Sequence, residues 1–189
     1  MAVYEFDFSY DDGKWELVNA NIAGGLLNVA LVPWTGGGGR YPDSNWGHGA
    51  NDNFELEVNF RRKIIDSEPE ISSWWTISIR LIDDILIQFE HETLSPNKLS
   101  IKVEGDEMVS KEQDMNDINW HSIKVRRVGT IYYLSVDDES EISYNYIIPK
   151  AIKSIRLGYK HSLPRENNGG EYDNFIYRWL KEQDYAFIM

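Results

Sequence analysis

Cysteine is absent from this sequence of 189 residues. The chain therefore forms no disulfide, and it offers neither a thiol nucleophile nor a thiolate metal ligand. Long hydrophobic runs are missing too, since the longest mostly apolar stretch, residues 23–34, is far shorter than the ~20 residues that span a bilayer. The start of the chain lacks the basic and apolar regions of a secretory signal. We expect no membrane insertion, and an extracellular or surface location only for a module of a larger protein.

Basic residues are scarce. The sequence has 19 Lys and Arg against 31 Asp and Glu, for a net charge of −12. This charge repels the phosphate backbone, so nucleic acids and anionic membranes are excluded as partners. Divalent cations, and neutral ligands such as glycans, are compatible with this charge. The alternative interpretation is an acidic surface that only aids solubility.

Helical periodicity is absent, whereas apolar and polar residues alternate in many short segments. The clearest alternating segments are 53–60, 74–81, 85–89, 98–103, 120–128, 131–136 and 154–159. Asp83 and Asp84 predict a hairpin turn between the second and third of these. We predict one all-β domain over residues 1–189, with about ten to twelve strands in two antiparallel sheets. The aromatic-rich segments 3–9 and 172–179 are expected to pair and secure the chain ends.

One pair of adjacent strands carries a family resemblance. Residues 120–127 read WHSIKVRR, residue 129 is glycine, and residues 132–137 read YYLSVD. This pattern resembles the Trp-His-x-Val-x-Val-x-Arg strand, short turn and Leu-x-Val-Asp-Gly strand of laminin G-like and related concanavalin A-like domains. Asp138 replaces the usual glycine, so we expect the turn there to differ. The segments 4–8 and 171–177 are similar to the first and last strands of that superfamily, and the resemblance spans most of the chain.

The resemblance implies a two-sheet antiparallel jelly-roll β-sandwich. It supports this fold better than it supports any activity, because one fold carries many functions. His121 shares a face with Ile123 and Val125 in strand register, so we interpret it as a hydrogen-bonded core histidine rather than a catalytic one.

Glycosidases of the laminarinase type in this superfamily carry three acidic residues on one strand face, spaced Glu-x-Asp-x-Glu. The similar strand here has Glu55 and Glu57, about 7 Å apart by strand rise, followed by Asn59. An amide cannot serve as nucleophile or acid, so catalysis would need a carboxylate from another strand, such as Glu90 beside Gln88. The alternative is that both glutamates face solvent, paired with an arginine such as Arg80.

The segment from 33 to 49 is long, glycine-rich and aromatic, and we expect a functional loop there. Rings beside polar side chains suit a sugar, whose CH face stacks while its hydroxyls form hydrogen bonds. Outward residues of the strand 74–81, with Glu57 and Gln88 nearby, are expected to supply the floor. The candidate ligand-binding residues are Trp34, Arg40, Tyr41, Trp46, His48, Trp74 and Arg80. The alternative is that these rings only cover one end of the sandwich.

The resemblance also implies a structural Ca²⁺ site between the first and last strands. Asp173 matches the last-strand ligand, and Glu5 or Asp7 would supply the first-strand ligand, because Ca²⁺ prefers hard oxygen ligands. The alternative is an Asp173 that only ties down neighbouring backbone.

Three functions therefore stay open. The first is a carbohydrate-binding, lectin-like module without catalysis, which recognises a glycan or polysaccharide through the aromatic loop and the concave sheet face. The second is a glycoside hydrolase that uses Glu55 and Glu57. The third is a protein-interaction or structural domain of a surface or phage protein, with self-association through a sheet edge as one form.

Overall fold

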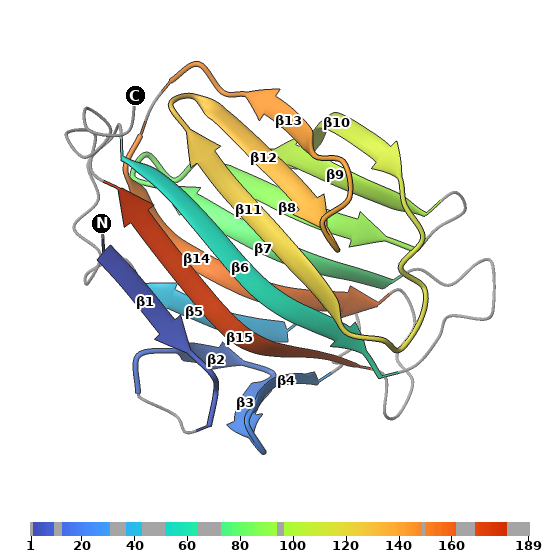
Figure 1. The fold of residues 1–189 in the computed structure, drawn as a ribbon. Coiled ribbons are helices and arrows are strands. Elements are labelled where there is room, and N and C mark those ends of the chain that lie inside the picture. The colour runs from blue at the N-terminus through green and yellow to red at the C-terminus, as the bar shows by residue number, and fades with distance from the viewer. Residues whose placement is uncertain are drawn as a thin grey trace.

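The computed structural model describes residues 2–9, 13–30, 37–42, 52–63, 73–93, 97–148, 150–161 and 169–180. Within these residues the regular structure is β-strand, and no helix there is long and apolar enough to cross a membrane. Two antiparallel sheets of eight and seven strands pack face to face (Figure 1). The prediction of an all-β, two-sheet sandwich is confirmed. The described strands number fifteen, more than we predicted.

The eight-stranded sheet is the front layer in Figure 1. In spatial order it contains β13 (Ile142–Asn145), β12 (Ile131–Val136), β11 (His121–Val128), β6 (Asn53–Arg62), β15 (Gly169–Leu180), β4 (Leu26–Ala30) and β3 (Ala20–Ala23), with β1 (Ala2–Phe6) also pairing with β15. The predicted pairing of the first and last strands is confirmed, since Tyr4 lies opposite Tyr177.

The seven-stranded sheet forms the other layer. Its order is β10 (Asp106–Glu112), β9 (Lys98–Val103), β8 (Leu86–Glu92), β7 (Ser73–Leu81), β14 (Ile152–His161), β5 (Gly37–Pro42) and β2 (Glu16–Val18). The prediction that the whole segment 33–49 is a loop is wrong for β5, which pairs along β14. Glycines at 37, 38 and 39 hid this strand, because they lack the side chains whose alternation indicates a strand.

Alternate side chains of both sheets fill the core between them. Leu56 and Val58 of β6 are fully buried, as are Ile77 and Phe89 on the opposite sheet. The hydroxyl of Tyr172 crosses the core and donates to the carbonyl oxygen of Gly158 at 2.6 Å, which ties the two sheets together. A buried hydroxyl needs such a partner, because leaving it unsatisfied costs about 1–3 kcal/mol.

The turn after β12 shows the effect of the missing glycine. Asp137 and Asp138 have φ angles of 53° and 57°, the left-handed conformation that glycine adopts at low cost. Asp137 offsets this by accepting hydrogen bonds from the backbone N–H of Ser122 at 2.8 Å and from His121. The turn therefore keeps a glycine-like backbone shape with an aspartate in place.

A buried arginine lies near each end of β6. Arg127 is 1% exposed and donates to the carbonyl oxygens of Asp52 and Lys150. Arg62, also 1% exposed, donates to the carbonyl oxygen of Met115 at 3.2 Å. Carbonyl acceptors are needed because a buried guanidinium without partners costs several kcal/mol. Both arginines thus fasten connecting segments across the ends of the sandwich.

His91 completes the cluster around Arg62. Its Nδ1 lies 3.0 Å from Arg62 Nη2 and accepts from that group, while its Nε2–H donates to the carbonyl oxygen of Gln113 at 2.8 Å. The ring stacks on Trp75 at a centroid distance of 6.5 Å. Burial, and then the charge of Arg62, lowers the pKa of His91 from 6.5 to about 3. The imidazole is therefore neutral in the folded protein at physiological pH.

This neutral histidine predicts a loss of stability in mild acid. As pH falls from 6.5 towards 3, unfolded His91 takes up a proton that the folded protein excludes. The free energy of unfolding should then fall by up to about 1.4 kcal/mol per pH unit. Urea unfolding between about pH 7 and about pH 5, above most carboxylate titrations, measures this slope. H91Q, which cannot titrate, should flatten it, and an unchanged slope in H91Q would contradict the assignment.

Candidate functional site

The outward face of the seven-stranded sheet is polar, and several of its side chains are poorly exposed. Strands β7 and β8 turn Ile77 and Phe89 into the core, so the residues that alternate with them point away from it. Outward polar residues here have exposures of 3–9%: Thr76, Ser78, Glu90, Ser100 and Ser154. Sequence reasoning placed Thr76 and Ser78 on this face, and the structure agrees.

A comparison with the other sheet shows that this face is recessed. The side chains of Glu90 and Lys102 are 8% and 22% exposed. On the outward face of the eight-stranded sheet, Glu57 and Lys124 are 33% and 32% exposed. Glu90 and Lys102 are thus less accessible than Glu57 and Lys124, as the floor of a binding site requires.

Strand register arranges the recessed side chains in two rows. Thr76, Glu90 and Ser100 form one row across β7, β8 and β9. Ser78, Gln88 and Lys102 form the next, and Arg156 of β14 continues it opposite Ser78. Neighbouring strands are about 4.8 Å apart, so each row presents hydroxyl, amide and charged groups at regular, short intervals.

Glu90 and Lys102 form an ion pair that joins the two rows. The pair holds the carboxylate in one orientation, so its remaining acceptor positions are fixed before a ligand arrives. Such preorganisation lowers the entropy cost of binding.

Comparisons with known proteins bear on the fold at this point. Neither a family model nor a curated protein matches the chain. Among solved structures, lectin I-B4 from Griffonia simplicifolia in its metal-free form has a TM-score of 0.66 and 14% identity, over 96% of this chain and 100% of that one. A β-glucanase from Bacillus licheniformis has a TM-score of 0.64 and 14% identity, over 96% and 99%. The CBM2 module of an evolved Dit of Lactobacillus casei BL23 phage J-1 gives 0.65 and 9%, over 92% and 93%.

The chain has the concanavalin A-like jelly-roll fold. At 9–14% identity this similarity establishes the fold but not the activity, which has to be argued from the side chains of the site.

On this concanavalin A-like sandwich, Glu55 and Glu57 face outward from the eight-stranded sheet. Arg178 of β15 lies 3.0 Å from Glu55 and 3.5 Å from Glu57. This agrees with the alternative of paired, solvent-facing glutamates. The expected partner was wrong, because Arg80 lies on the other sheet, 3.8 Å from Asp84. The expectation that Glu57 lies near Gln88 is wrong for the same reason.

The carboxylate spacing recurs on β8 of the recessed sheet. Gln88, Glu90 and Glu92 alternate there with Ile87, Phe89 and His91, which are buried. Glu90 was considered from the sequence, but Glu92 was missed. The signal was present, because residues 88, 90 and 92 alternate with a run of buried side chains just as residues 55, 57 and 59 do. In this order the amide comes first and the carboxylates second and third.

Most residues of the predicted aromatic loop lie outside the ranges that the structure describes. Trp34, Trp46 and His48 lie outside the described residues. Arg40 and Tyr41 belong to β5, and Trp74 belongs to β7, but their side chains are likewise outside the description. The backbone register places residue 40 opposite residue 156 in the same sheet as β7, so this part of the segment does join the recessed sheet.

The interpretation of His121 as a hydrogen-bonded core residue is confirmed. It is 8% exposed, and its Nδ1 and Nε2 lie 2.6 Å and 3.0 Å from carboxylate oxygens of Asp137 and Asp117. Both ring nitrogens are therefore engaged in fastening the segment before β11 to the turn after β12.

The residues proposed for calcium do not form a metal cage. Asp7 accepts from the backbone N–H of Ser9 at 2.9 Å, and Asp173 accepts from that of Asn174 at 2.7 Å. The second contact is the alternative we gave for Asp173. Glu5 is exposed on β1. Among the described residues, no group of at least three His, Asp or Glu side chains is placed to hold a metal.

The recessed ion pair predicts an asymmetry between the two sheets. K102A leaves Glu90 poorly exposed without its cation, so we expect a loss of about 2 kcal/mol or more in the free energy of unfolding. K124A, which removes a lysine paired with Asp138 on the other sheet, should cost under about 1 kcal/mol. Chemical denaturation of both variants measures the difference. Equal losses would show that the Glu90 site is as well hydrated as the outer face.

Proposed function

We propose that this chain is a non-catalytic carbohydrate-binding domain whose ligand lies on the recessed face of the seven-stranded sheet. The observation that carries the proposal is the double row of polar side chains on β7, β8 and β9, of which Thr76, Ser78, Glu90 and Ser100 are buried and Gln88 and Lys102 are half-buried. In this proposal aromatic and polar residues of the neighbouring segments complete the site: Trp34, Arg40, Tyr41, Trp46, His48, Trp74 and Arg80.

The chemistry of the rows supports a sugar over other ligands. Ser78 and Gln88 offer both donors and acceptors, and Glu90 offers oriented acceptors, which match hydroxyls that donate and accept in turn. Lys102 already neutralises Glu90, so the face does not require a charged ligand. The similar structures of a lectin, a β-glucanase and a CBM2 module support the same ligand class.

A glycan panel tests the recessed face with a matched pair of variants. Q88A should weaken binding of the best glycan about two- to tenfold, because a hydrogen-bonding group is lost from the floor. N59A removes an amide from the outward face of β6 and should bind like wild type. W34A and W46A should each weaken binding about tenfold or more if they stack on the sugar. The proposal fails if no glycan binds, or if Q88A and N59A behave alike.

The candidate calcium site is tested by thermal melting with and without EDTA. A structural Ca²⁺ at Glu5, Asp7 and Asp173 would compete with the backbone N–H groups of Ser9 and Asn174 for the carboxylates of Asp7 and Asp173. EDTA that lowers the melting temperature of wild type but not of D173N would support a calcium site there. Equal melting with and without EDTA would remove calcium from the proposal.

A glycoside hydrolase is the second candidate, and the observation that favours it is on β8. Glu90 and Glu92 share the outward face, and alternate residues on a strand lie about 7 Å apart, within the range of carboxylate separations that glycosidases use. The nucleophile or base position of such a row is occupied by Gln88. An amide at that position, in place of a carboxylate, favours binding without turnover.

Reducing-end release from β-glucans separates the two functions. We expect no turnover by wild type above the background of a buffer control. If turnover is seen, and is abolished in E90Q and E92Q but retained in E57Q, the domain is an enzyme that uses the recessed face. Loss in E57Q or E55Q instead would assign catalysis to the eight-stranded sheet.

A further inference from the structure

A row of polar side chains with a tryptophan at one end crosses the outward face of the eight-stranded sheet. Register places Arg61 of β6 opposite Glu171 of β15, Glu171 opposite Asn28 of β4, and Asn28 opposite Asn21 of β3. Trp120 precedes β11 and extends its register by one residue beyond the pair of His121 and Phe60, so it faces Arg61. We call this row, together with Lys63, the Trp120 platform.

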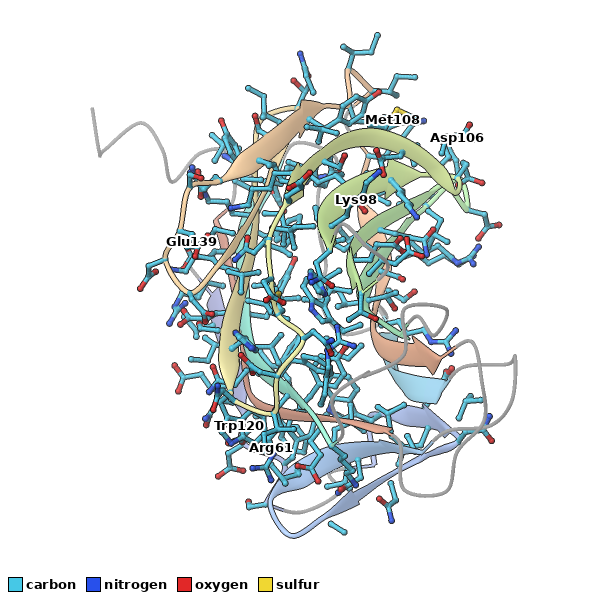
Figure 2. The ribbon with its side chains drawn as sticks, turned by 90° about the vertical axis from the view of Figure 1, so that its right-hand side faces the viewer. Arg61, Lys98, Asp106, Met108, Trp120 and Glu139 are labelled. Carbon is cyan, nitrogen blue, oxygen red and sulfur yellow. The ribbon has the colours of Figure 1, made fainter. Side chains whose placement is uncertain are left out.

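Trp120 is an exposed ring that is held in place. It is 38% exposed, and the Arg61 guanidinium lies 4.6 Å from the ring centroid (Figure 2). A cation over the ring fixes its orientation, so stacking on it costs little conformational entropy.

Connected polar contacts run along the platform. Arg61 Nε lies 2.6 Å from one oxygen of Glu171, and Lys63 Nζ lies 3.2 Å from the other. Lys63 also donates to Asn28 Oδ1 at 3.2 Å, and Asn28 Nδ2 donates to the carbonyl oxygen of Ala23 at 3.1 Å. The side chain of Glu171 is only 10% exposed, so this buried carboxylate anchors the network to the sheet.

A cavity that is wide open to solvent lies at the end of the platform away from Trp120. It measures about 620 Å³ and is lined by Ala20, Asn21, Ala23, Gly24, Asn28 and Lys63. This volume suits a small ligand, and the alanine and glycine residues leave room for one. The cavity is distinct from the recessed face, because β3, β4 and β6 belong to the other sheet.

The charge of the platform selects among sugars. Arg61 and Lys63 share the single carboxylate of Glu171, which leaves one net positive charge in a chain of net charge −12. Lys63 is 37% exposed at its side chain, so its ammonium is accessible to an anionic group. An oligosaccharide with one ring stacked on Trp120 and a carboxylate on another ring would satisfy both features.

We propose that the Trp120 platform is a second carbohydrate site, for an acidic saccharide of the uronate class. One sugar ring stacks on Trp120. A carboxylate on another ring of the same saccharide forms an ion pair with Lys63 at the cavity. The site is independent of the proposed site on the seven-stranded sheet, since the two lie on opposite faces of the sandwich.

Calorimetric titration with an oligogalacturonate tests this assignment by comparing the affinity of each variant with that of wild type. W120A should weaken binding about tenfold or more, and W120Y, which keeps a ring, should recover part of it. K63M should weaken binding and reduce its dependence on salt. The matched control is Y133A, because Tyr133 lies on the same face beneath Arg126 at 4.0 Å, and Arg126 pairs with Glu141 just as Arg61 pairs with Glu171.

The outcomes separate this site from the proposed one. Binding that is lost in W120A and K63M but kept in Q88A and Y133A establishes the platform, whatever the glycan panel shows for the recessed face. No binding of the oligogalacturonate, or equal binding by W120A, K63M and wild type, overturns it. A circular dichroism melt of each variant confirms that a loss of binding is not a loss of fold.

Discussion

The burial of alternate side chains between the two sheets fixes the register of every central strand. Shifting β8 by one residue would bring Gln88 and Glu90 into the core and expose Phe89, which is fully buried. Such a shift is very unfavourable, because it exposes apolar area and buries unpaired polar groups together. The outward rows, including the recessed face and the Trp120 platform, are therefore held in place by contacts on the opposite side of each strand.

Several charged groups on both outward faces are arranged as pairs. Glu90 pairs with Lys102, Glu171 with Arg61 and Lys63, and Glu55 with Arg178. The exposed pair of Glu55 and Arg178 contributes little to stability, whereas breaking the poorly exposed pair of Glu90 and Lys102 is costly. Their value lies in orientation, since a ligand meets side chains already held in one arrangement and displaces water rather than reorganising protein.

The sequence predicted the face on which a residue lies better than the sheet to which it belongs. Alternation identified β6, β7, β9, β11 and β12 almost to their bounds, and the fold class followed from them. It could not show that Glu57 and Gln88 lie on opposite layers, because sheet membership depends on pairings such as β6 with β15 and β7 with β14. Those pairings join residues far apart in the chain. Strand β5 was missed because its glycines carry no alternation.

The position of β15 governs the order in which the sandwich can be completed. It lies between β6 on one side and β1 and β4 on the other, yet it is the last of the described strands in the chain. During synthesis, β1, β4 and β6 leave the ribosome long before their common neighbour exists. Their edges stay open until residues 169–180 arrive. The eight-stranded sheet is therefore completed only after almost the whole domain has been translated, and until then the open strand edges can pair with another chain.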